Sequence, residues 1–441
     1  MQTYLIMLVT IIGGFLFISP FSMAEQGFLL FLFAMLLWGG NLLPILHATI
    51  IIPILAIALG LISFTDVTTI LLSPILAIFI FGFAFACFSQ EQGLDKVVLH
   101  TVNKFSKGHE RVASYLLFAL TCFISMWTSN VVTAALMLPV VMSINTTFQH
   151  KGDKQPSQNS KTHYLAVGVV FSATLGGMCT QVGSSTSLIA SSLAQLDFIG
   201  WLIGALPIVT LLWLAMLLLL EIYFKPQFRK KLTLPPPEPL SAAQKWGLVI
   251  VIGTLLLWVI AAAVLRGETK LYGLIPLVSV AILLAKRFIS IQGAVNAIRW
   301  RVIVIFVSAF TLGKVLHASG GGQLIVDWVT PLLSNSSIWI QLAIFLLLLV
   351  TMTEFMSNVA CASLFAPVLF LLLIPQGVSV EQVALMAGIG GSFAFVLPTA
   401  TPANNLAYAH QYVTRRTMIG FGGSFKAAAT LILFACLIVF H

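Results

Sequence analysis

The sequence predicts an all-α polytopic membrane protein with eleven transmembrane helices and two re-entrant helical hairpins arranged as inverted repeats. Apolar residues make up 59% of the 441-residue chain and charged residues only 8%, whereas soluble domains contain roughly 25% charged residues. Apolar stretches long enough to cross a bilayer core recur along the whole chain. Matched polar interruptions in the two halves predict the hairpins and the inverted arrangement.

The eleven predicted crossings are separated by short hydrophilic gaps. They cover residues 3–20, 27–46, 49–63, 71–89, 164–193, 199–224, 246–265, 271–285, 300–318, 382–410 and 423–440. We interpret the first stretch as a membrane helix and not as a cleaved signal peptide. A signal peptide needs a positively charged leading region, and no Lys or Arg precedes Lys96.

The basic residues predict the orientation of the chain. The net charge of +9 comes from Lys and Arg in the gaps and not from an amphipathic face, which favours a topology signal over a nucleic-acid partner. With the N-terminus inside, all basic residues fall on the cytoplasmic side except Arg266, Lys270 and Lys314; Lys426 is counted as lying beside the last helix. We therefore expect an inner-membrane protein with a cytoplasmic N-terminus and an external C-terminus.

A Pro-rich cytoplasmic linker at 233–245 separates a first half, 1–232, from a second half, 246–441. Each half contains a long apolar stretch with Ser-Asn near its middle, at 111–148 and 337–374. Either stretch could form two full crossings. Basic residues at both ends of the first stretch and a polar tip at mid-length favour re-entrant hairpins.

The two hairpins share one motif. It is present as Ser125-Met-Trp-Thr-Ser129-Asn130-Val131 and as Thr353-Glu-Phe-Met-Ser357-Asn358-Val359. A proline follows ten residues after the motif serine in both halves, at Pro139 and Pro367. The hydroxyl residue four positions before each Ser-Asn would share a helix face with it.

Each hairpin is followed by a broken helix, 164–193 or 382–410, with a polar break rich in Gly or Pro. Such breaks are costly in lipid and persist where backbone lines a cavity, so a matched pair points to a transporter binding site. An odd number of crossings separates the hairpins, which makes the halves inverted. Helix N-termini suit an anion, whereas unwound carbonyls, hydroxyls and amide oxygens suit sodium.

At these motifs the chain resembles the divalent anion:sodium symporter family, which includes dicarboxylate, citrate and sulfate carriers. The resemblance covers nearly the whole chain and rests on the Met-Trp-Thr-Ser-Asn and Thr-Glu-Phe-Met-Ser-Asn contexts. It implies a secondary active transporter in the lipid bilayer that couples sodium to a small divalent anion by an elevator-type mechanism. It also implies a homodimer, with sodium as coupling ion and no further cofactor.

The resemblance implies the following site residues. One sodium ion would be held by Ser125, Ser129, Asn130 and the Gly183 carbonyl. A second would be held by Thr353, Ser357, Asn358 and the Ala400 carbonyl. The substrate would contact Ser129, Asn130, Val131, Ser184, Ser185, Asn358, Val359, Thr401 and Pro402.

The chain departs from the family pattern at both tips, which have Ser-Asn-Val where the family has Ser-Asn-Thr. The first broken helix also has Gln181 where proline is usual, and Ser184-Ser185-Thr186-Ser187 where Thr-Pro-Pro-Asn is common. The sodium positions are better kept than the substrate positions, so the motifs indicate sodium coupling more directly than a dicarboxylate substrate.

Other transport functions stay open: an anion exchanger or proton-coupled carrier on the same fold, or a metalloid-oxyanion or cation carrier of a related group. A membrane enzyme is disfavoured because the motifs contain Ser, Asn, Thr and Gly, with Glu354 as the only acid nearby. Lys314 and Glu354 are ionisable groups inside apolar segments. For them a structural ion pair, a capping role and a role in coupling remain alternatives.

Overall fold

The computed structural model describes most of the chain, in the following ranges: 21–39, 45–72, 83–85, 87–88, 91–146, 160–228, 241–264, 269–298, 300–333, 336–398 and 400–439, with Gly14 and Ile80. Most of the predicted crossings 3–20 and 71–89, most of the linker 233–245 and the end of the first hairpin at 147–148 lie outside these residues. All regular elements of the described part are helices, as the sequence predicts.

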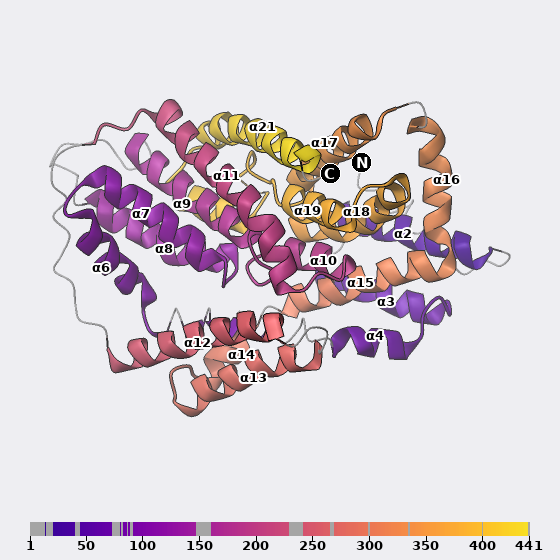
Figure 1. Ribbon diagram of the computed structural model, residues 1–441, viewed down its shortest axis with the longest axis horizontal. Helices are drawn as coiled ribbons and strands as arrows, with labels where there is room; N and C mark the ends of the chain where they lie inside the picture. The colour runs from indigo at the N-terminus through magenta and orange to yellow at the C-terminus, as the bar shows by residue number, and fades with distance from the viewer. Residues whose placement is uncertain are drawn as a thin grey trace.

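The first half contains α2 (Met23–Gly39), α3 (Ile45–Ala58), α4 (Phe64–Leu71), α6 (Leu94–Ser106), α7 (Glu110–Ser125), α8 (Asn130–Thr146), α9 (Ser160–Met178), α10 (Ser185–Leu193) and α11 (Phe198–Phe224). The second half contains α12 (Ala242–Val264), α13 (Thr269–Ala285), α14 (Ile291–Ala297), α15 (Trp300–Ser319), α16 (Gly321–Leu333), α17 (Ile338–Phe355), α18 (Asn358–Leu373), η2 (Ile374–Gln376), α19 (Val380–Leu385), the π-helix η3 (Met386–Gly390), α20 (Pro402–Ala409) and α21 (Arg415–Val439) (Figure 1).

Four described helices are long and apolar enough to cross a membrane: α11, α17, α18 continued by η2, and α21. The pair α15 and α16, bent by 80°, is a fifth candidate. Other predicted crossings are shorter helices or are divided by a break, as α9 and α10 are. The length of α17 and α18 fits either a full crossing or one arm of a re-entrant hairpin.

The two halves repeat one order of elements. A short helix, α6 or α16, precedes each pair of hairpin arms, α7–α8 or α17–α18, and a broken helix follows, α9–α10 or α19–α20. The sequence reasoning placed α6 and α16 in hydrophilic gaps. In α6, apolar residues such as Val98, Val102 and Phe105 recur at helical spacing among polar ones, so this helix lacks the continuous apolar run that identifies a crossing.

Two groups of helices can be distinguished. We call α7–α11 with α17–α21 the hairpin body, and α2–α4 with α12–α16 the frame. The largest buried apolar cluster joins helices of both hairpins within the body. Its centre is Phe171, whose ring lies 4.8 Å from that of Phe395 and 5.6 Å from those of Phe421 and Phe425.

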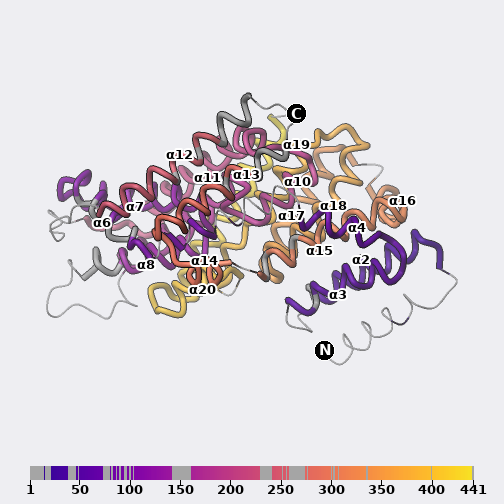
Figure 2. The backbone as a smooth tube through the Cα atoms, turned by 90° about the horizontal axis from the view of Figure 1, so that it is seen from below, coloured from indigo at the N-terminus to yellow at the C-terminus, as the bar shows by residue number. Residues whose placement is uncertain are grey.

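The frame has a separate core in which α2 and α3 pack against α15. Leu188 of α10 and Leu364 of α18 reach into this core, and Phe198 of α11 shares a further buried cluster with Leu283 of α13. The frame therefore meets the body at α10, α11 and α18. In Figure 1, α12–α14 lie along the lower edge, and in both Figures 1 and 2 α2–α4 lie at the end opposite to α6–α8.

The last helix, α21, contacts the broken helices of both halves. The Thr417 hydroxyl lies 3.4 Å from Nδ1 of His163, near the start of α9. At the other end of α21, the Gln382 side chain of α19 donates to the Leu437 carbonyl at 2.8 Å. Because α21 has 25 residues and a helix rises about 1.5 Å per residue, the two broken helices start at opposite ends of a long helix.

The structure changes the expected bounds of this helix. It was predicted at 423–440 and begins at Arg415, where the Thr414 hydroxyl accepts a hydrogen bond from the Thr417 amide. Thr414 therefore caps the helix. Lys426 lies inside α21, as it already does within the predicted bounds 423–440, so it should not have been counted as a residue beside the last helix and does not report topology in the way that the gap residues do.

Candidate functional site

Both Ser-Asn motifs lie where a helix ends and the next begins. The first tip, 126–129, joins α7 to α8, and the second, 356–357, joins α17 to α18. The Ser129 hydroxyl accepts from the Val132 amide at 3.4 Å, and the Ser357 hydroxyl accepts from the Ala360 amide at 3.2 Å. Each motif serine therefore caps the helix that leaves its tip. Asn130 and Asn358 are the first residues of those helices, α8 and α18, and both are half-buried.

The first tip packs against the break between α9 and α10. The buried Ser125 hydroxyl donates to the Ala173 carbonyl, and an added Cβ at Gly183 would lie only 2.4 Å from the Ser125 carbonyl oxygen. The Thr180 hydroxyl donates to the Met126 carbonyl and accepts from the Gly183 amide at 3.1 Å. The structure thus brings Ser125 and Gly183 of the first predicted sodium set together.

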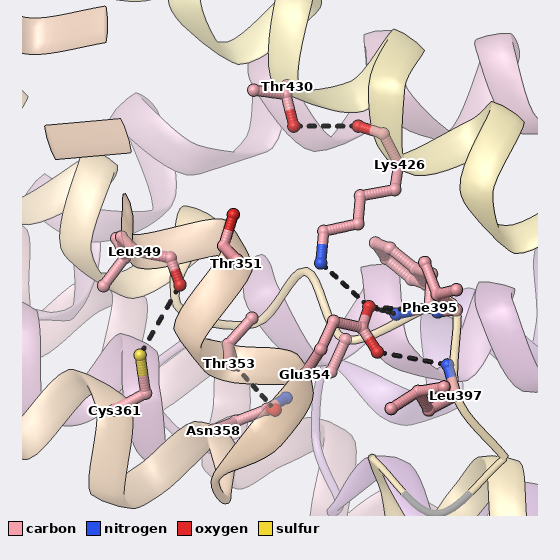
Figure 3. Close-up of polar contacts among 12 residues, drawn as sticks. Leu349, Thr351, Thr353, Glu354, Asn358, Cys361, Phe395, Leu397, Lys426 and Thr430 are labelled. Atoms are coloured by element: carbon pink, nitrogen blue, oxygen red, sulfur yellow. Dashed lines mark hydrogen bonds and ion pairs between the residues drawn. The ribbon is translucent and has the colours of Figure 1, made fainter. Parts of the chain in front are cut away.

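The second tip binds the break between η3 and α20 (Figure 3). The Thr353 hydroxyl lies 3.0 Å from Oδ1 of Asn358 and 2.6 Å from the Gly391 carbonyl oxygen. Thr353 and Asn358 of the second predicted sodium set therefore meet. The carbonyl joined to them belongs to Gly391, whereas Ala400, the predicted carbonyl ligand, lies in a turn closed by its amide to the Leu397 carbonyl at 3.1 Å.

The predicted substrate residues lie at four helix starts. Val131 and Val359 are in the first turns of α8 and α18, and both are half-buried. Ser184 and Ser185 begin α10, and the Ser184 hydroxyl lies 2.6 Å from that of Thr186. Thr401 and Pro402 begin α20; the Thr401 hydroxyl accepts from the Asn404 amide at 3.1 Å, and Pro402 is exposed.

Elements of opposite halves meet at these starts. Helix α8 of the first hairpin contacts α20 of the second half, and α18 of the second hairpin contacts α10 of the first half. The two breaks are also joined directly, because the Thr186 and Ser392 hydroxyls share a hydrogen bond. The predicted substrate residues of the two halves are therefore carried by contacting elements, which no periodicity in the sequence could show.

Sequence reasoning did not place the buried ion pair of Glu354 and Lys426. Nζ of Lys426 lies 2.9 Å from Oε1 of Glu354, and the two side chains are 13% and 7% exposed. The Glu354 carboxylate also accepts from the amides of Phe395, Val396 and Leu397 at 2.9, 3.0 and 3.1 Å. Of the three alternatives for Glu354, the ion pair is thus observed, and its carboxylate also binds amides of the unwound segment. The sequence signal for this ion pair was the position of an ionisable residue inside an apolar segment, and both Glu354 and Lys426 show it.

Asn404 was also missed, although it stands only two residues after Pro402 in the sequence. It is fully buried, and its Nδ2 donates to the carbonyls of Ala394 at 3.0 Å and Leu397 at 3.3 Å.

Among the residues that the structure describes, no group of three or more His, Cys, Asp or Glu side chains could hold a metal ion. The site instead presents hydroxyl, amide and carbonyl oxygens.

Lys314 lies in the frame and not at the tips. Its Nζ is 2.9 Å from Oδ1 of Asp66, and both side chains are partly exposed. Asp66 is in a predicted gap between crossings. Hydrogen bonds from the Ser63 hydroxyl and the Lys314 ammonium hold its pKa below the usual range. Such an exposed pair contributes little to stability.

Broken helices that meet paired hairpin tips, in an all-helical chain with long apolar helices, are features of a membrane transporter. A sequence profile described as "Citrate transporter" matches residues 28–390, and the chain belongs to this family. The resemblance to divalent anion transporters is thereby confirmed.

Two relatives and one solved structure are similar over most of their length. An uncharacterized transporter of Haemophilus influenzae is 29% identical, over 92% of this chain and 89% of its own. The sodium-dependent dicarboxylate transporter SdcS of Staphylococcus saprophyticus is 25% identical, over 93% of this chain and 87% of its own. The Alcanivorax borkumensis YdaH transporter structure superposes with a TM-score of 0.54 at 14% identity, covering 84% of this chain and 87% of that one. This last likeness concerns the fold alone.

Proposed function

We propose that the protein is a sodium-coupled secondary active symporter of a small divalent anion, a dicarboxylate or sulfate, that works by an elevator-type mechanism. One observation carries the proposal: in each half a hairpin tip touches the break of the following helix through backbone and hydroxyl oxygens. In the first half Ser125 packs against Gly183, and in the second half Thr353 binds Asn358 and Gly391.

Sodium is proposed to bind at both tips. It is a hard cation that prefers oxygen ligands, and unwound backbone supplies carbonyl oxygens that a regular helix uses internally. At the second tip the Thr353 hydroxyl lies within hydrogen-bond distance of both the Asn358 amide oxygen and the Gly391 carbonyl oxygen. We therefore add Gly391 to the second sodium set of Thr353, Ser357, Asn358 and Ala400.

The anion is proposed to bind between the four helix starts. The N-terminal ends of α8, α10, α18 and α20 carry unpaired backbone amides and partial positive charge, both of which favour an anion. The residues in these first turns, Asn130, Ser185, Asn358 and Pro402, are uncharged. Charge balance is then supplied by the helix ends and the bound sodium ions.

The arrangement of the two helix groups supports an elevator-type movement between inverted halves. The hairpin body has a large apolar core of its own and enters the frame core only through α10 and α18, so the body could move as a unit against the frame. The starts of the broken helices at opposite ends of α21 support the inversion. The homodimer, the inner membrane location and the orientation of the termini belong to the same proposal.

The similarity to SdcS, a sodium-dependent dicarboxylate transporter, supports the same substrate and coupling ion. The test is uptake into proteoliposomes of labelled succinate, citrate, sulfate and phosphate, with an inward sodium gradient or with potassium in its place. We expect accumulation of one divalent anion only with the sodium gradient. Equal uptake in potassium would overturn sodium coupling. Uptake driven by a pH gradient or by an internal anion would favour the proton-coupled carrier or the exchanger.

The hairpin proposal has its own test. A re-entrant hairpin places residues 111 and 148 at the same membrane face and keeps its tip, 126–129, within the bilayer, whereas two full crossings would expose the tip at the opposite face. Single cysteines at 111 and 148, labelled by a membrane-impermeant maleimide from one side of the membrane, should react together, and a cysteine in the tip should not be exposed at the other face. Reaction of 111 and 148 from opposite sides, or a tip exposed at the face opposite to both, would show that the first hairpin is not re-entrant.

A further inference from the structure

In the break between η3 and α20, described at 391–398 and 400–401, several backbone polar groups are bound by side chains of α17 and α20. Thr353 binds the Gly391 carbonyl, and the next residue, Glu354, binds the amides of 395–397. Asn404 binds the carbonyls of Ala394 and Leu397. Two successive residues of α17 therefore hold both parts of the unwound segment.

Glu354 needs a counter-charge because its carboxylate is buried. Three amide hydrogen bonds stabilise the carboxylate, and the Lys426 ammonium at 2.9 Å neutralises it. A buried charge without a partner is strongly unfavourable. The pair thus allows a carboxylate to serve as the acceptor for consecutive backbone amides next to the second tip (Figure 3).

Helix α21 also contacts the unwound segment at a second residue, Gly422. Gly422 lies four residues before Lys426, on the same face of the helix. An added Cβ at Gly422 would lie 2.1 Å from the Phe395 carbonyl oxygen. The backbone of the unwound segment therefore lies directly against α21, and Lys426 reaches Glu354 across this contact. Hairpin, break and last helix are held together at one place.

We propose that Glu354 is a positioning residue, with Lys426 as its counter-ion, and that the pair transmits sodium occupancy of the second tip to the start of α20. This rests on the proposed function. Thr353 and Glu354 are adjacent, so a shift of Thr353 when sodium binds also moves Glu354 and the 395–397 backbone. That backbone leads into Thr401 and Pro402, where the anion is proposed to bind. Sodium and anion would then raise each other's affinity by the same factor.

The first test measures coupling. The variant Glu354→Gln/Lys426→Met removes both charges and so leaves no buried charge unpaired. Asp66→Asn/Lys314→Met is the matched control, because it removes a Lys–carboxylate pair of the same 2.9 Å length from the frame. Apparent substrate affinity is measured at saturating and at low sodium, per amount of folded protein. In the double variant at 354 and 426 we expect the effect of sodium on that affinity to fall at least tenfold, and in the control we expect it unchanged.

A merely structural role predicts a different result. In that case the variant would yield less folded protein while the sodium dependence of substrate affinity stayed as in the wild type, and the proposal would be wrong. Lys426→Arg provides a conservative variant, since it keeps the counter-charge and is expected to retain coupling. Loss of coupling in Lys426→Arg equal to that in the double variant would also contradict the proposal.

The second test does not depend on transport. Val396 is half-buried within the unwound segment, so a single cysteine there, in a chain without its native cysteines, reports the position of the segment through its maleimide labelling rate. We expect the double variant at 354 and 426 to label at least fivefold faster than its parent and to lose any response to sodium. Equal rates with and without the ion pair would overturn the positioning role. If the double variant labels faster but the wild-type protein shows no sodium-dependent uptake, the positioning role of Glu354 stands and only the proposed function is wrong.

Discussion

The two hairpin sites are built from the same motif but are held together in different ways. At the first tip the contacts are neutral: the Thr180 hydroxyl bridges Met126 and Gly183, and Gly183 packs against the Ser125 carbonyl. At the second tip a buried carboxylate, Glu354, holds the unwound backbone and is itself neutralised by Lys426. Met126 and Glu354 occupy equivalent positions, one residue after the motif hydroxyl.

This difference indicates that two copies of one motif can depend on different kinds of interaction. Close packing through glycine makes the first site sensitive to added volume, because backbone atoms cannot move aside. A buried ion pair makes the second site sensitive to a change in charge, because each partner depends on the other. We therefore expect substitutions of similar size to have different effects in the two halves, and four predictions test this comparison.

The largest effect is expected from breaking the charge balance. Lys426→Met leaves the Glu354 carboxylate buried without a counter-charge, which costs about 3–5 kcal/mol. Thr180→Val in the first half removes neutral hydrogen bonds only and costs about 1–3 kcal/mol. Thermal unfolding of the purified protein should show the larger loss for Lys426→Met. Equal losses in the two variants would remove the distinction between a charged and a neutral site.

The second prediction concerns volume at the first tip. An added Cβ at Gly183 would lie 2.4 Å from the Ser125 carbonyl oxygen and 2.7 Å from the Gly177 Cα, so Gly183→Ala must separate the tip from the break. Overpacking of this kind costs about 1–3 kcal/mol, and we expect sodium-dependent uptake to fall by roughly tenfold or more. Gly313→Ala of α15 is the control, since its nearest neighbour would be 3.5 Å away. Comparable loss in the control would show that the breaks are not especially tight.

The third prediction concerns the oxygen ligands of sodium. Asn130→Ala and Asn358→Ala each remove an amide oxygen from a proposed set. A lost hydrogen-bond-like contact of about 0.5–1.5 kcal/mol corresponds to a rise of roughly threefold to tenfold in the sodium concentration at half-maximal uptake. Uptake measured over a sodium series provides the values. If both variants keep full activity and equal sodium dependence, the tips do not bind sodium.

The smallest effect is expected at the two valines that replace the family's threonines. Valine keeps the shape of threonine but lacks its hydroxyl, so Val131→Thr/Val359→Thr adds two donors to the first turns of α8 and α18. Each new hydrogen bond to an anion oxygen replaces one to water, so its net effect should be near the lower end of the usual range, about 0.5 kcal/mol or roughly twofold, and uptake should shift from sulfate toward succinate by about that factor. An unchanged ratio of the two would mean that Ser184, Ser185 and Thr401 already supply the donors.

The sequence by itself determined the membrane class, the paired helix–break–helix elements and the bounds of the broken helices. Continuous apolar runs and their polar interruptions are local properties of the sequence. They therefore predict where helices end without knowledge of the tertiary contacts. The interruption at Ser129-Asn130 and that at Ser357-Asn358 coincide with helix starts in the structure. For the same reason α6 and α16 escaped prediction, because their apolar residues are spaced along one face and form no continuous run.

Only the tertiary structure decided which partners these elements meet. Lys426 and Glu354 are 72 residues apart in the chain, and Thr186 and Ser392 are 206 apart. No local pattern encodes such pairings, which arise when helices of opposite halves pack together. The same holds for the second break, where the Thr353 hydroxyl binds the carbonyl of Gly391, 38 residues further along the chain. Unwound backbone has no periodicity, so the sequence does not show which of its carbonyls faces the tip. That is decided by the side chains, such as Glu354 and Asn404, that bind the unwound backbone and fix its path.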